Sequence, residues 1–374
     1  MGGGVAGLLT VQALLDRSDD LALAGHGAPV SITHAVHVPG HGTASRSGGL
    51  ALRYASTDPR ADGWAARSTV LAGELARRHG HLRPHVRTAR AVVVSRRGPV
   101  LGHVGDVVDP ASLGLDGHTF ALRVAPSPQW DTCALLRRWP VALIADPRVV
   151  AVRLPERLGS TADLLALHEA HHADVTVACL GLGAHVLADT RLHGRLGVLL
   201  RGPVPHGTVH AAAAVVDDDD VLRPRYTVPH VGTGPQPGTA PQPGSAPGVG
   251  DHLHVGGTYL PVEDPADWDD PARLREQALA EVPALLADVG EVFPALAGWQ
   301  PDAPPWWHLR PVRDEVALAR MDPGLVGDRD VVVSHGWGGS GWTIGPAVAE
   351  ETARSVLRGT DHVDPLAAHG WWRP

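Results

Sequence analysis

The sequence of this 374-residue chain predicts a mixed α/β fold. Short runs of β-branched residues with strand periodicity are interspersed with segments of helical periodicity along the whole chain. The chain opens on closely spaced glycines that run directly into a helical segment. Near the C-terminus, a strand passes through a glycine turn into another helix. With 44% apolar and 19% charged residues, the composition is that of a globular protein with a sizeable core.

The composition excludes several classes of function. There is no Lys and no Asn, and all 32 basic residues are Arg. Lysine Schiff-base catalysis and the lysine-containing phosphate loop of many nucleotide hydrolases are therefore ruled out. A net charge of −8 without a basic cluster argues against binding to nucleic acid or to an anionic membrane surface. Because depletion of these residues is typical of a GC-rich genome, which also enriches Gly and His, a single Gly or His is weak evidence for a functional site.

The sequence favours a cytoplasmic location. No basic segment followed by an apolar core opens the chain, and no apolar run approaches the length of a membrane span. Cys133 and Cys179 lie in separate apolar segments and are expected to be buried free thiols, which are typical of a reducing compartment.

The first half of the chain alternates between helix and strand. The first helix follows the opening glycines, with Leu8 and Leu15 on its apolar side. Asp62 is the expected N-cap of a later helix whose buried side carries Trp64 and Val70. The helices after the first are expected at 63–78, 131–139 and 161–172, and the strands at 30–38, 90–95, 141–144 and 174–179.

The second half contains a low-complexity segment between two strands. Residues 232–250 hold a near-repeat of Pro-Gln-Pro-Gly and are expected to form a flexible surface loop. The strands at 223–228 and 252–260 then form a hairpin around this loop, and the four consecutive Asp at 217–220 are expected to be solvated. A helix at 270–289, a strand at 330–335, a glycine turn at 336–341 and a helix at 346–357 complete the chain.

The opening glycines have the spacing of a dinucleotide-binding turn. Gly2, Gly4 and Gly7 satisfy G-x-G-x-x-G, which lets a pyrophosphate approach the backbone N–H groups at a helix N-terminus. Two features depart from the usual pattern. The preceding strand is absent, and no Asp or Glu follows the next strand, at His37 and Val38, to hold a ribose. A translation start upstream of Met1 would explain the first departure, and mass spectrometry of the native N-terminus tests it.

A second motif points to metal chemistry. Residues 168–172 match H-E-x-x-H, which on a helix would place His168 and His172 on one face with Glu169 as a general base. A strand is expected to begin immediately after the motif, however, where zinc peptidases continue their helix or add a ligand. A solvated helix face is therefore favoured over a zinc hydrolase, and no metal is expected.

The C-terminal half carries the most specific pattern. His308-Leu-Arg310-Pro-Val-Arg313 precedes a strand, and His335-Gly-Trp-Gly-Gly-Ser-Gly-Trp-Thr343 runs into a helix. These segments resemble the flavin-dependent D-amino-acid oxidase family. Further segments agree with that family in the same order, namely the opening glycine loop, residues 43–49, the helix at 63–78 and the strand end at 173–181. The resemblance covers nearly the whole chain.

The resemblance implies an α/β fold with two interleaved domains. The FAD-binding domain is Rossmann-like, with its first strand truncated in this chain, and comprises residues 1–55, 140–195 and 305–374. The substrate-binding domain is an α+β unit built on an antiparallel sheet, and comprises residues 56–139 and 196–304.

The resemblance also implies roles for individual residues. Arg310 matches the arginine that clamps the substrate carboxylate, Tyr226 a tyrosine whose hydroxyl also contacts it, and Gly339 the backbone carbonyl that receives the substrate amine. Leu222 stands where the family has a second pocket tyrosine, so the preferred side chain is left open. The implied FAD-binding residues are Gly2, Gly4, Gly7, Thr43, Ala44, Ser45, Gly181, Gly338, Gly341, Trp342 and Thr343.

The implied activity is FAD-dependent oxidation of D-amino acids to 2-oxo acids, with ammonia and hydrogen peroxide, by hydride transfer to flavin N5. The partners are then a small amino acid and dioxygen, without nucleic acid or membrane, and a homodimer is left open. One alternative is a glycine or N-methyl amino-acid oxidase of the same fold. Another is a degenerate, non-catalytic protein, which the missing first strand and the absent ribose acid would favour.

Overall fold

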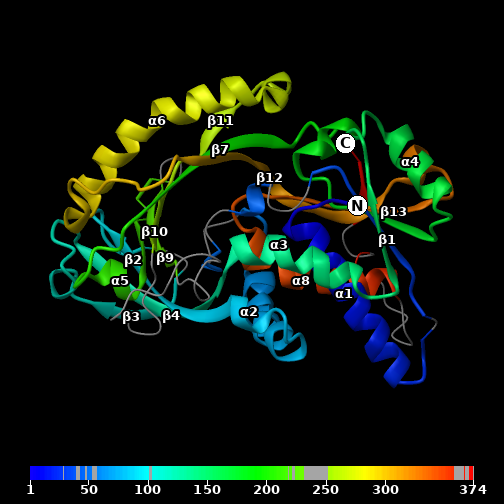
Figure 1. Cartoon of the computed structure of the whole chain (residues 1–374), viewed down its shortest axis with the longest axis horizontal. Coiled ribbons are helices and arrows are strands. Elements are labelled where there is room, and N and C mark those ends of the chain that lie inside the picture. The colour runs from blue at the N-terminus through cyan, green and yellow to red at the C-terminus, as the bar shows by residue number, and fades with distance from the viewer. Residues whose placement is uncertain are drawn as a thin grey trace, which may run out of the picture.

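The structure is a computed structural model that describes residues 1–374 except 28, 39–42, 47–48, 53–56, 101–102, 218, 221–223, 231–251, 358–365, 367–369 and 374. Within these residues the chain forms one 12-stranded sheet and one two-stranded sheet, with helices on both sides of the larger sheet (Figure 1). The predicted mixed α/β class is therefore confirmed. The strand bounds are β1 Ile32–Val36, β2 Val86–Ser95, β3 Gly105–Val108, β4 Phe120–Trp130, β5 Val149–Arg153, β6 Val175–Ala178, β7 His193–Gly202, β8 Ala214–Asp217, β9 Arg225–His230, β10 His252–Gly256, β11 Leu260–Val262, β12 Trp306–Met321, β13 Asp330–Trp337 and β14 Trp371–Trp372.

The long strand β12 joins two differently built parts of the large sheet, whose main order is β3-β4-β2-β8-β9-β10-β7-β12-β13-β6. Its first half pairs antiparallel with β7, from Trp306 to Val312, and its second half pairs with β13. On the β7 side nearly all pairings are antiparallel, whereas β13 and β6 run parallel. Arg310 therefore lies near the boundary between the two parts.

Met1 and Gly2 connect the two sheets. The N–H of Gly2 donates to the carbonyl of Ala35 in β1 at 3.0 Å, and the N–H of Cys179, just beyond β6, donates to the carbonyl of Met1 at 2.8 Å. β1 pairs in parallel with β5 on its other side. Two residues of extended chain thus lie between β1 and β6, in place of the first strand of a Rossmann-like domain, which the sequence predicted to be truncated.

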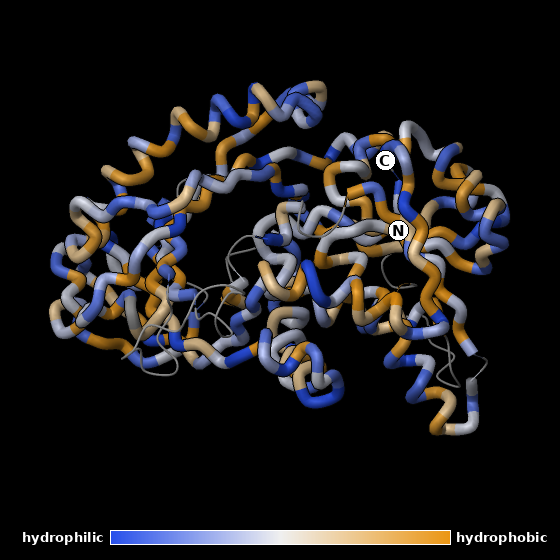
Figure 2. The backbone as a smooth tube through the Cα atoms, viewed as in Figure 1, coloured by the Kyte–Doolittle hydropathy of each residue, from blue (hydrophilic) through white to orange (hydrophobic). Residues whose placement is uncertain are grey.

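Helices cover the two faces of the large sheet. α1 (Val5–Leu23), α2 (Ala61–Arg78), α3 (Thr132–Ile144) and α8 (Gly341–Val356) share one apolar core. On the opposite face α6 (Pro271–Val292) packs through Leu274, Leu285 and Val289. Hydrophobic and hydrophilic residues alternate turn by turn along α6 (Figure 2), as expected for a helix with one buried side. The remaining helices are α4 (Thr161–Ala170), α5 (Val209–Ala212) and α7 (Pro323–Val326). Within the described residues, every helix is too short or too polar to cross a membrane.

Several predicted boundaries are wrong. The expected strand at 141–144 is the last turn of α3, because Leu143 continues the buried stripe of Leu136 and Trp139 past Pro140. Asp62 lies inside the first turn of α2 rather than at its N-cap, and Val70 is exposed. The last helix begins at Gly341, five residues before the predicted start at 346.

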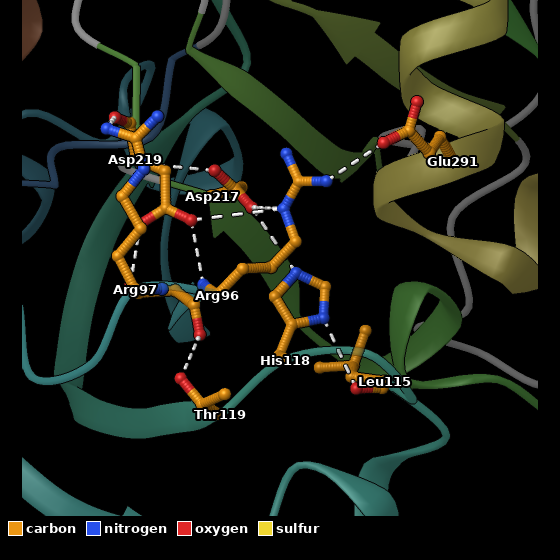
Figure 3. A network of polar contacts seen from close by, with 9 residues as sticks. Arg96, Arg97, Leu115, His118, Thr119, Asp217, Asp219 and Glu291 are labelled. Carbon is orange, nitrogen blue, oxygen red and sulfur yellow. Dashed lines mark hydrogen bonds and ion pairs between the residues drawn. The ribbon is translucent and has the colours of Figure 1, made fainter.

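Part of the Asp run is buried, contrary to the prediction that it is a solvated loop. Asp217 ends β8 with 3% of its surface exposed. The carboxylate of Asp219 accepts hydrogen bonds from the Ser95 hydroxyl at 2.6 Å and the Arg96 backbone N–H at 2.7 Å. Figure 3 shows how Arg96 extends from this cluster to Glu291 on α6. The run therefore ties the end of β8 to the end of β2.

Its neighbour, the predicted loop at 232–250, lies outside the described residues, while the predicted hairpin pairing of β9 with β10 is confirmed.

Two deeply buried histidines are expected to make the fold sensitive to acid. Burial lowers the pKa of His210 to about 4, with a smaller contribution from His118, and lowers the pKa of His254 to about 3, with a contribution from His230. Between pH 6.5 and pH 4 the unfolded chain then binds more protons than the folded one, so stability falls as pH falls. By pH 5 the loss is roughly 2 kcal/mol per histidine.

The measurement is the thermal midpoint as a function of pH. His210→Gln removes one of the buried histidines whose pKa is lowered and should give a shallower fall between pH 6.5 and 5 than the unaltered chain. The pKa of Asp131 is held at about 2, in part by a hydrogen bond from His85 that opposes the effect of burial, so Asp131 affects stability only at lower pH. A midpoint that stays constant down to pH 5 would contradict the assignment of the histidines as buried and neutral.

Candidate active site

The opening glycines are required by the packing of the first turn. Gly2 has φ +123°, and a Cβ there would lie 2.1 Å from the carbonyl oxygen of Cys179. A Cβ on Gly7 would lie 2.0 Å from the carbonyl oxygen of Gly2. Any side chain at either position would push α1 away from the chain beneath it. The spacing seen in the sequence is therefore the spacing that brings the start of α1 close to β6.

The N-terminus of α1 is an electropositive backbone site. Gly4 is its N-cap, no side chain caps it, and no acidic residue lies in its first turn. The N–H of Val5 donates to the Ser45 hydroxyl at 2.9 Å, which fixes the helix start against residues 44–46. The neighbouring N–H groups point out of an uncapped helix end, an arrangement that binds phosphate groups.

A long cavity runs from this helix end to Arg310. Its volume is about 540 Å³. It brings together most of the residues that the sequence predicted to bind FAD, although they come from distant parts of the chain. The segments that line it include residues 1–6, 43–45, 179–183, 307–311 and 334–339, with Gly341 and Trp342. Gly7 and Thr343, which the sequence also predicted, do not line it; Gly7 lies behind the turn, and the Thr343 hydroxyl donates to the carbonyl of Leu52 at 3.1 Å.

The glycine turn between β13 and α8 also lines the cavity and lies beside the start of α1, since a Cβ on Gly341 would be 3.0 Å from the Val5 side chain. Gly338 has φ +56°, and its N–H donates to the carbonyl of Pro311 on β12 at 2.7 Å. Trp342, in the first turn of α8, donates from its indole N–H to the carbonyl of Ser45 at 2.7 Å and packs against Trp130. The start of α8 is therefore fixed to the same segment that holds the start of α1.

Arg310 projects from β12 across a glycine. A Cβ on Gly197 of β7 would lie 2.5 Å from the guanidinium carbon of Arg310, so the side chain lies flat over that residue. One guanidinium nitrogen donates to the carbonyl of Thr258 at 2.8 Å, and the guanidinium lies 5.5 Å from the ring centroid of Tyr259. Among the described residues no carboxylate forms an ion pair with Arg310, so its positive charge is available to a ligand.

Tyr226 lies on the same face of the sheet as Arg310. Its ring lies over Gly256 of β10, where a Cβ would be 2.2 Å from the ring. Tyr226 belongs to a buried apolar cluster with Leu50, Leu52 and Val228. It does not line the long cavity. The two glycines, 197 and 256, lie on adjacent strands, so Arg310 and Tyr226 extend over neighbouring parts of one surface.

Tyr259 was missed by the sequence reasoning. It is partly buried, stacks beside Arg310, and lines a cavity of about 200 Å³ that meets the large one at residues 336–339. The chain has only three Tyr, and this one directly follows Gly256-Gly257-Thr258. The scarcity of Tyr was the only signal in the sequence that could have drawn attention to it.

A buried charged cluster lies behind the glycine turn. His335 Nε2 donates to Asp189 at 2.7 Å, and Arg313 lies 3.3 Å from the same carboxylate oxygen. Burial would raise the pKa of Asp189, but the hydrogen bond from His335 and the nearby charges lower it. Burial lowers the pKa of His335. The carboxylate is therefore ionised and the imidazole neutral, which leaves the charge of Asp189 balanced by Arg313.

Two further sequence predictions concern a missing ribose-binding acid and a metal-binding motif. At the end of β1, His37 stands where a ribose-binding acid is common, and its Nδ1 lies 3.3 Å from the carbonyl of Leu154. In the H-E-x-x-H motif, α4 ends at Ala170, and His172 has φ 47°, so His168 and His172 do not share a helix face. Glu169 pairs with Arg329. Nowhere in the described ranges do three His, Cys, Asp or Glu side chains gather in a way that could hold a metal ion.

Comparisons with known proteins agree with this geometry. The family model described as "FAD dependent oxidoreductase" matches residues 132–355, which is more than half of the chain. No curated protein matches the sequence.

Solved structures share the fold over almost the whole chain. The glycine oxidase of Geobacillus kaustophilus superposes with a TM-score of 0.68 at 17% identity, covering 100% of this chain and 97% of the other. The iminodiacetate oxidase of Chelativorans sp. BNC1 gives 0.61 at 16% identity, with 97% and 95% covered. The L-proline dehydrogenase of P. horikoshii gives 0.62 at 13% identity, with 100% and 97% covered. At these identities the likeness establishes the fold alone.

Proposed function

The chain belongs to the FAD dependent oxidoreductase family, and we propose that it oxidises D-amino acids to 2-oxo acids. The observation that carries the proposal is the position of Arg310. Its guanidinium has no carboxylate partner among the described residues and lies in the same cavity as the N-terminus of α1. A guanidinium without a carboxylate partner is suited to the carboxylate of an amino acid, which it can hold with two parallel hydrogen bonds.

FAD is the cofactor of the family, and the residues present fit it. Side chains are excluded at Gly2 and Gly7 by close backbone contacts, which leaves the start of α1 open to a pyrophosphate. The turn at 338–341 and the start of α8 line the same cavity and would contact the isoalloxazine ring. When bound, FAD accepts a hydride from the substrate α-carbon and is reoxidised by dioxygen, which becomes hydrogen peroxide.

The chain itself contributes binding and orientation. Arg310 holds the substrate carboxylate, with Tyr226 as the proposed second contact, and the carbonyl of Gly339 receives the amine. With FAD bound, the N-terminus of α8 would stabilise negative charge on the flavin, because the backbone N–H groups at a helix start carry partial positive charge. No side-chain acid or base is required at the α-carbon, and the imino acid that is released hydrolyses to the 2-oxo acid and ammonia.

An oxidase of glycine or N-methyl amino acids is the second candidate. The superposition with a glycine oxidase over the full chain favours it, and it requires the same carboxylate clamp. The two candidates differ only in what surrounds the α-carbon and the amine. The proposal includes the cytoplasm as the compartment, because Cys133 and Cys179 are both free thiols.

The proposal is tested with the purified full chain. We expect a yellow protein with the absorption bands of oxidised flavin, which releases hydrogen peroxide and ammonia with neutral D-amino acids. A panel with the L-enantiomers, glycine and sarcosine separates the two candidates, since glycine and sarcosine should be the better substrates of the second. A colourless protein that takes up no added FAD would contradict both and favour a degenerate, non-catalytic chain.

A further inference from the structure

A separate cavity of about 410 Å³ lies on the α6 side of the large sheet. This outer cavity, lined mainly by β2, β4, α5 and the turn at 112–114, shares no lining residue with the long cavity. β2, β4 and α5 lie together at one end of the molecule, and β1 and β13 lie at the other (Figure 1). A ligand in the outer cavity would therefore displace neither FAD nor an amino-acid substrate.

The floor of the outer cavity is apolar and buried. Val92 of β2 and Ala213, which directly precedes β8, are only 3% and 6% exposed. Both belong to the apolar core that includes Leu285 and Val289 of α6. Because the sheet and α6 hold this floor in place, the hollow is preformed and offers apolar contact to the body of a small molecule.

Two arginines line the outer cavity from neighbouring strands. Arg123 of β4 pairs directly opposite Val92, and Arg90 lies two residues before Val92 on β2. Residues two apart on a strand share a face, and diagonal neighbours on an antiparallel pair are roughly 7–8 Å apart. Both long side chains can therefore reach one ligand in the cavity.

Neither arginine has a carboxylate partner within the part of the chain that the structure describes. By contrast Arg96, on the same strand as Arg90, pairs with Glu291 at 3.1 Å. Asp106 stands opposite Arg123 on β3, but no ion pair joins the two side chains. None of the residues that line the outer cavity is acidic. The cavity therefore presents two positive charges to an anion.

The two hydroxyl groups in the lining provide acceptors rather than donors. The Ser112 hydroxyl donates to the carbonyl of Asp109 at 2.6 Å, and the Thr208 hydroxyl donates to the carbonyl of Pro205 at 2.8 Å. Because each hydroxyl proton is already used, the oxygens are left to accept hydrogen bonds from a ligand. They suit hydroxyl groups on the ligand, whereas its anionic group is left to the arginines.

We propose that the outer cavity is a binding site for a small organic phosphate monoester. Near neutral pH such a phosphate carries almost two negative charges, which match the guanidiniums of Arg90 and Arg123. Arginine binds phosphate oxygens with parallel, charge-assisted hydrogen bonds. A hydroxylated carbon skeleton then meets the Ser112 and Thr208 oxygens above the apolar floor. The site is independent of the proposed function, because it takes no part in the oxidation.

The experiment is isothermal titration calorimetry on the full chain loaded with FAD and freed of excess FAD. Ribose 5-phosphate is the probe, and we expect a dissociation constant below about 1 mM. Arg90→Gln and Arg123→Gln should each weaken binding at least about tenfold, because each removes charge-assisted hydrogen bonds. Asp106→Asn should tighten binding roughly two- to threefold, because it removes a negative charge beside Arg123.

Arg275→Gln is the matched control. Arg275 is exposed on α6 and lines neither the long cavity nor the outer one, so its substitution removes the same charge from another part of the surface. Binding should be unchanged in this variant. If Arg275→Gln weakens binding as much as Arg123→Gln does, the attraction is spread over the surface and the site is overturned. Thermal midpoints show that the variants are folded, since Arg90 and Arg123 are both exposed.

Three further ligands test the chemistry of the site. Ribose should not bind, and inorganic phosphate and succinate should each bind at least about tenfold more weakly than ribose 5-phosphate, since one lacks the carbon skeleton and the other divides its charge. Equal affinity for inorganic phosphate would overturn the role of the skeleton, and equal affinity for succinate would overturn the choice of phosphate. Absence of ribose 5-phosphate binding to the unaltered chain would overturn the whole proposal. These outcomes are read from binding alone, so they are distinct from a failure of the proposed function, which is read from turnover.

Discussion

Arg310→Leu is expected to lower kcat/KM for every amino-acid substrate by roughly a thousandfold, which corresponds to about 4 kcal/mol. That is the usual cost of removing one partner from a buried charged pair. The reason is specific to this chain, because no described carboxylate pairs with Arg310 and the nearest other arginine on β7, Arg195, lies 4.0 Å from Glu263. The flavin absorption spectrum should be unchanged, since the proposed FAD-binding residues are contributed by other segments. The measurement is steady-state kinetics together with the absorption spectrum.

Two further changes test whether the geometry of Arg310, and not only its charge, matters. Arg310→Lys keeps the charge but loses the planar fork, so it should recover only part of the activity. Gly197→Ala keeps the arginine but adds a methyl group 2.5 Å from its guanidinium carbon. The guanidinium must therefore move, and KM should rise. Gly80→Ala, with no atom within 4 Å of the added Cβ, is the control. Near-normal kinetics in Arg310→Leu would refute the clamp.

Gly7→Ala is expected to abolish tight FAD binding. The new Cβ would lie 2.0 Å from the carbonyl oxygen of Gly2, and both atoms belong to rigid parts of the chain. The start of α1 must therefore move away from Gly2, and the N–H groups that would receive the pyrophosphate move with it. We expect a purified protein that is largely colourless, and a dissociation constant for added FAD at least about a hundredfold higher, from a loss of ~3 kcal/mol or more.

The matched control for Gly7→Ala is another helical glycine. Gly73 lies within α2 and has no atom within 4 Å of an added Cβ. Gly73→Ala should therefore retain FAD and raise stability by about 0.5–1 kcal/mol, because alanine loses less backbone entropy on forming a helix. Fluorescence titration with FAD and thermal denaturation distinguish the two variants. Equal FAD affinity in Gly7→Ala and in the unaltered chain would show that the opening turn is not the pyrophosphate site.

Local patterns in the sequence were sufficient for most elements and for several ligand-facing segments. The period of the apolar residues located α1, α4 and α6, and the runs of β-branched residues located β1, β6 and β13. The sequence patterns gave wrong predictions where the local sequence favoured one structure and packing in the core favoured another. Pro140 and the β-branched residues after it suggested a strand at 141–144, yet burial of Leu143 against the α1 side of the core keeps that segment helical. The strands β4 and β7 went unrecognised although each is at least ten residues long.

Acidic and aromatic residues were harder to interpret than apolar ones. Four consecutive Asp indicated a solvated loop, but Asp217 and Asp219 cap the ends of two strands through buried hydrogen bonds. Tyr226 was singled out because it matched a family motif, whereas Tyr259 matched none. Its ring lies beside Arg310, which is 51 residues away in sequence and is brought to it by the pairing of β7, β10 and β12.

The sequence by itself determined the class of the fold, the glycine turns and Arg310 as the candidate clamp. The fold class and the glycine turns depend on short-range constraints, namely side-chain period and the backbone freedom of glycine, whereas Arg310 was identified from the resemblance to the D-amino-acid oxidase family. The tertiary structure decided which of these residues share a cavity, that the guanidinium of Arg310 has no carboxylate partner among the described residues, and that Tyr259 lies beside Arg310. Those properties depend on contacts between strands far apart in the chain, because a side chain is positioned by the register of its neighbours as much as by its own identity.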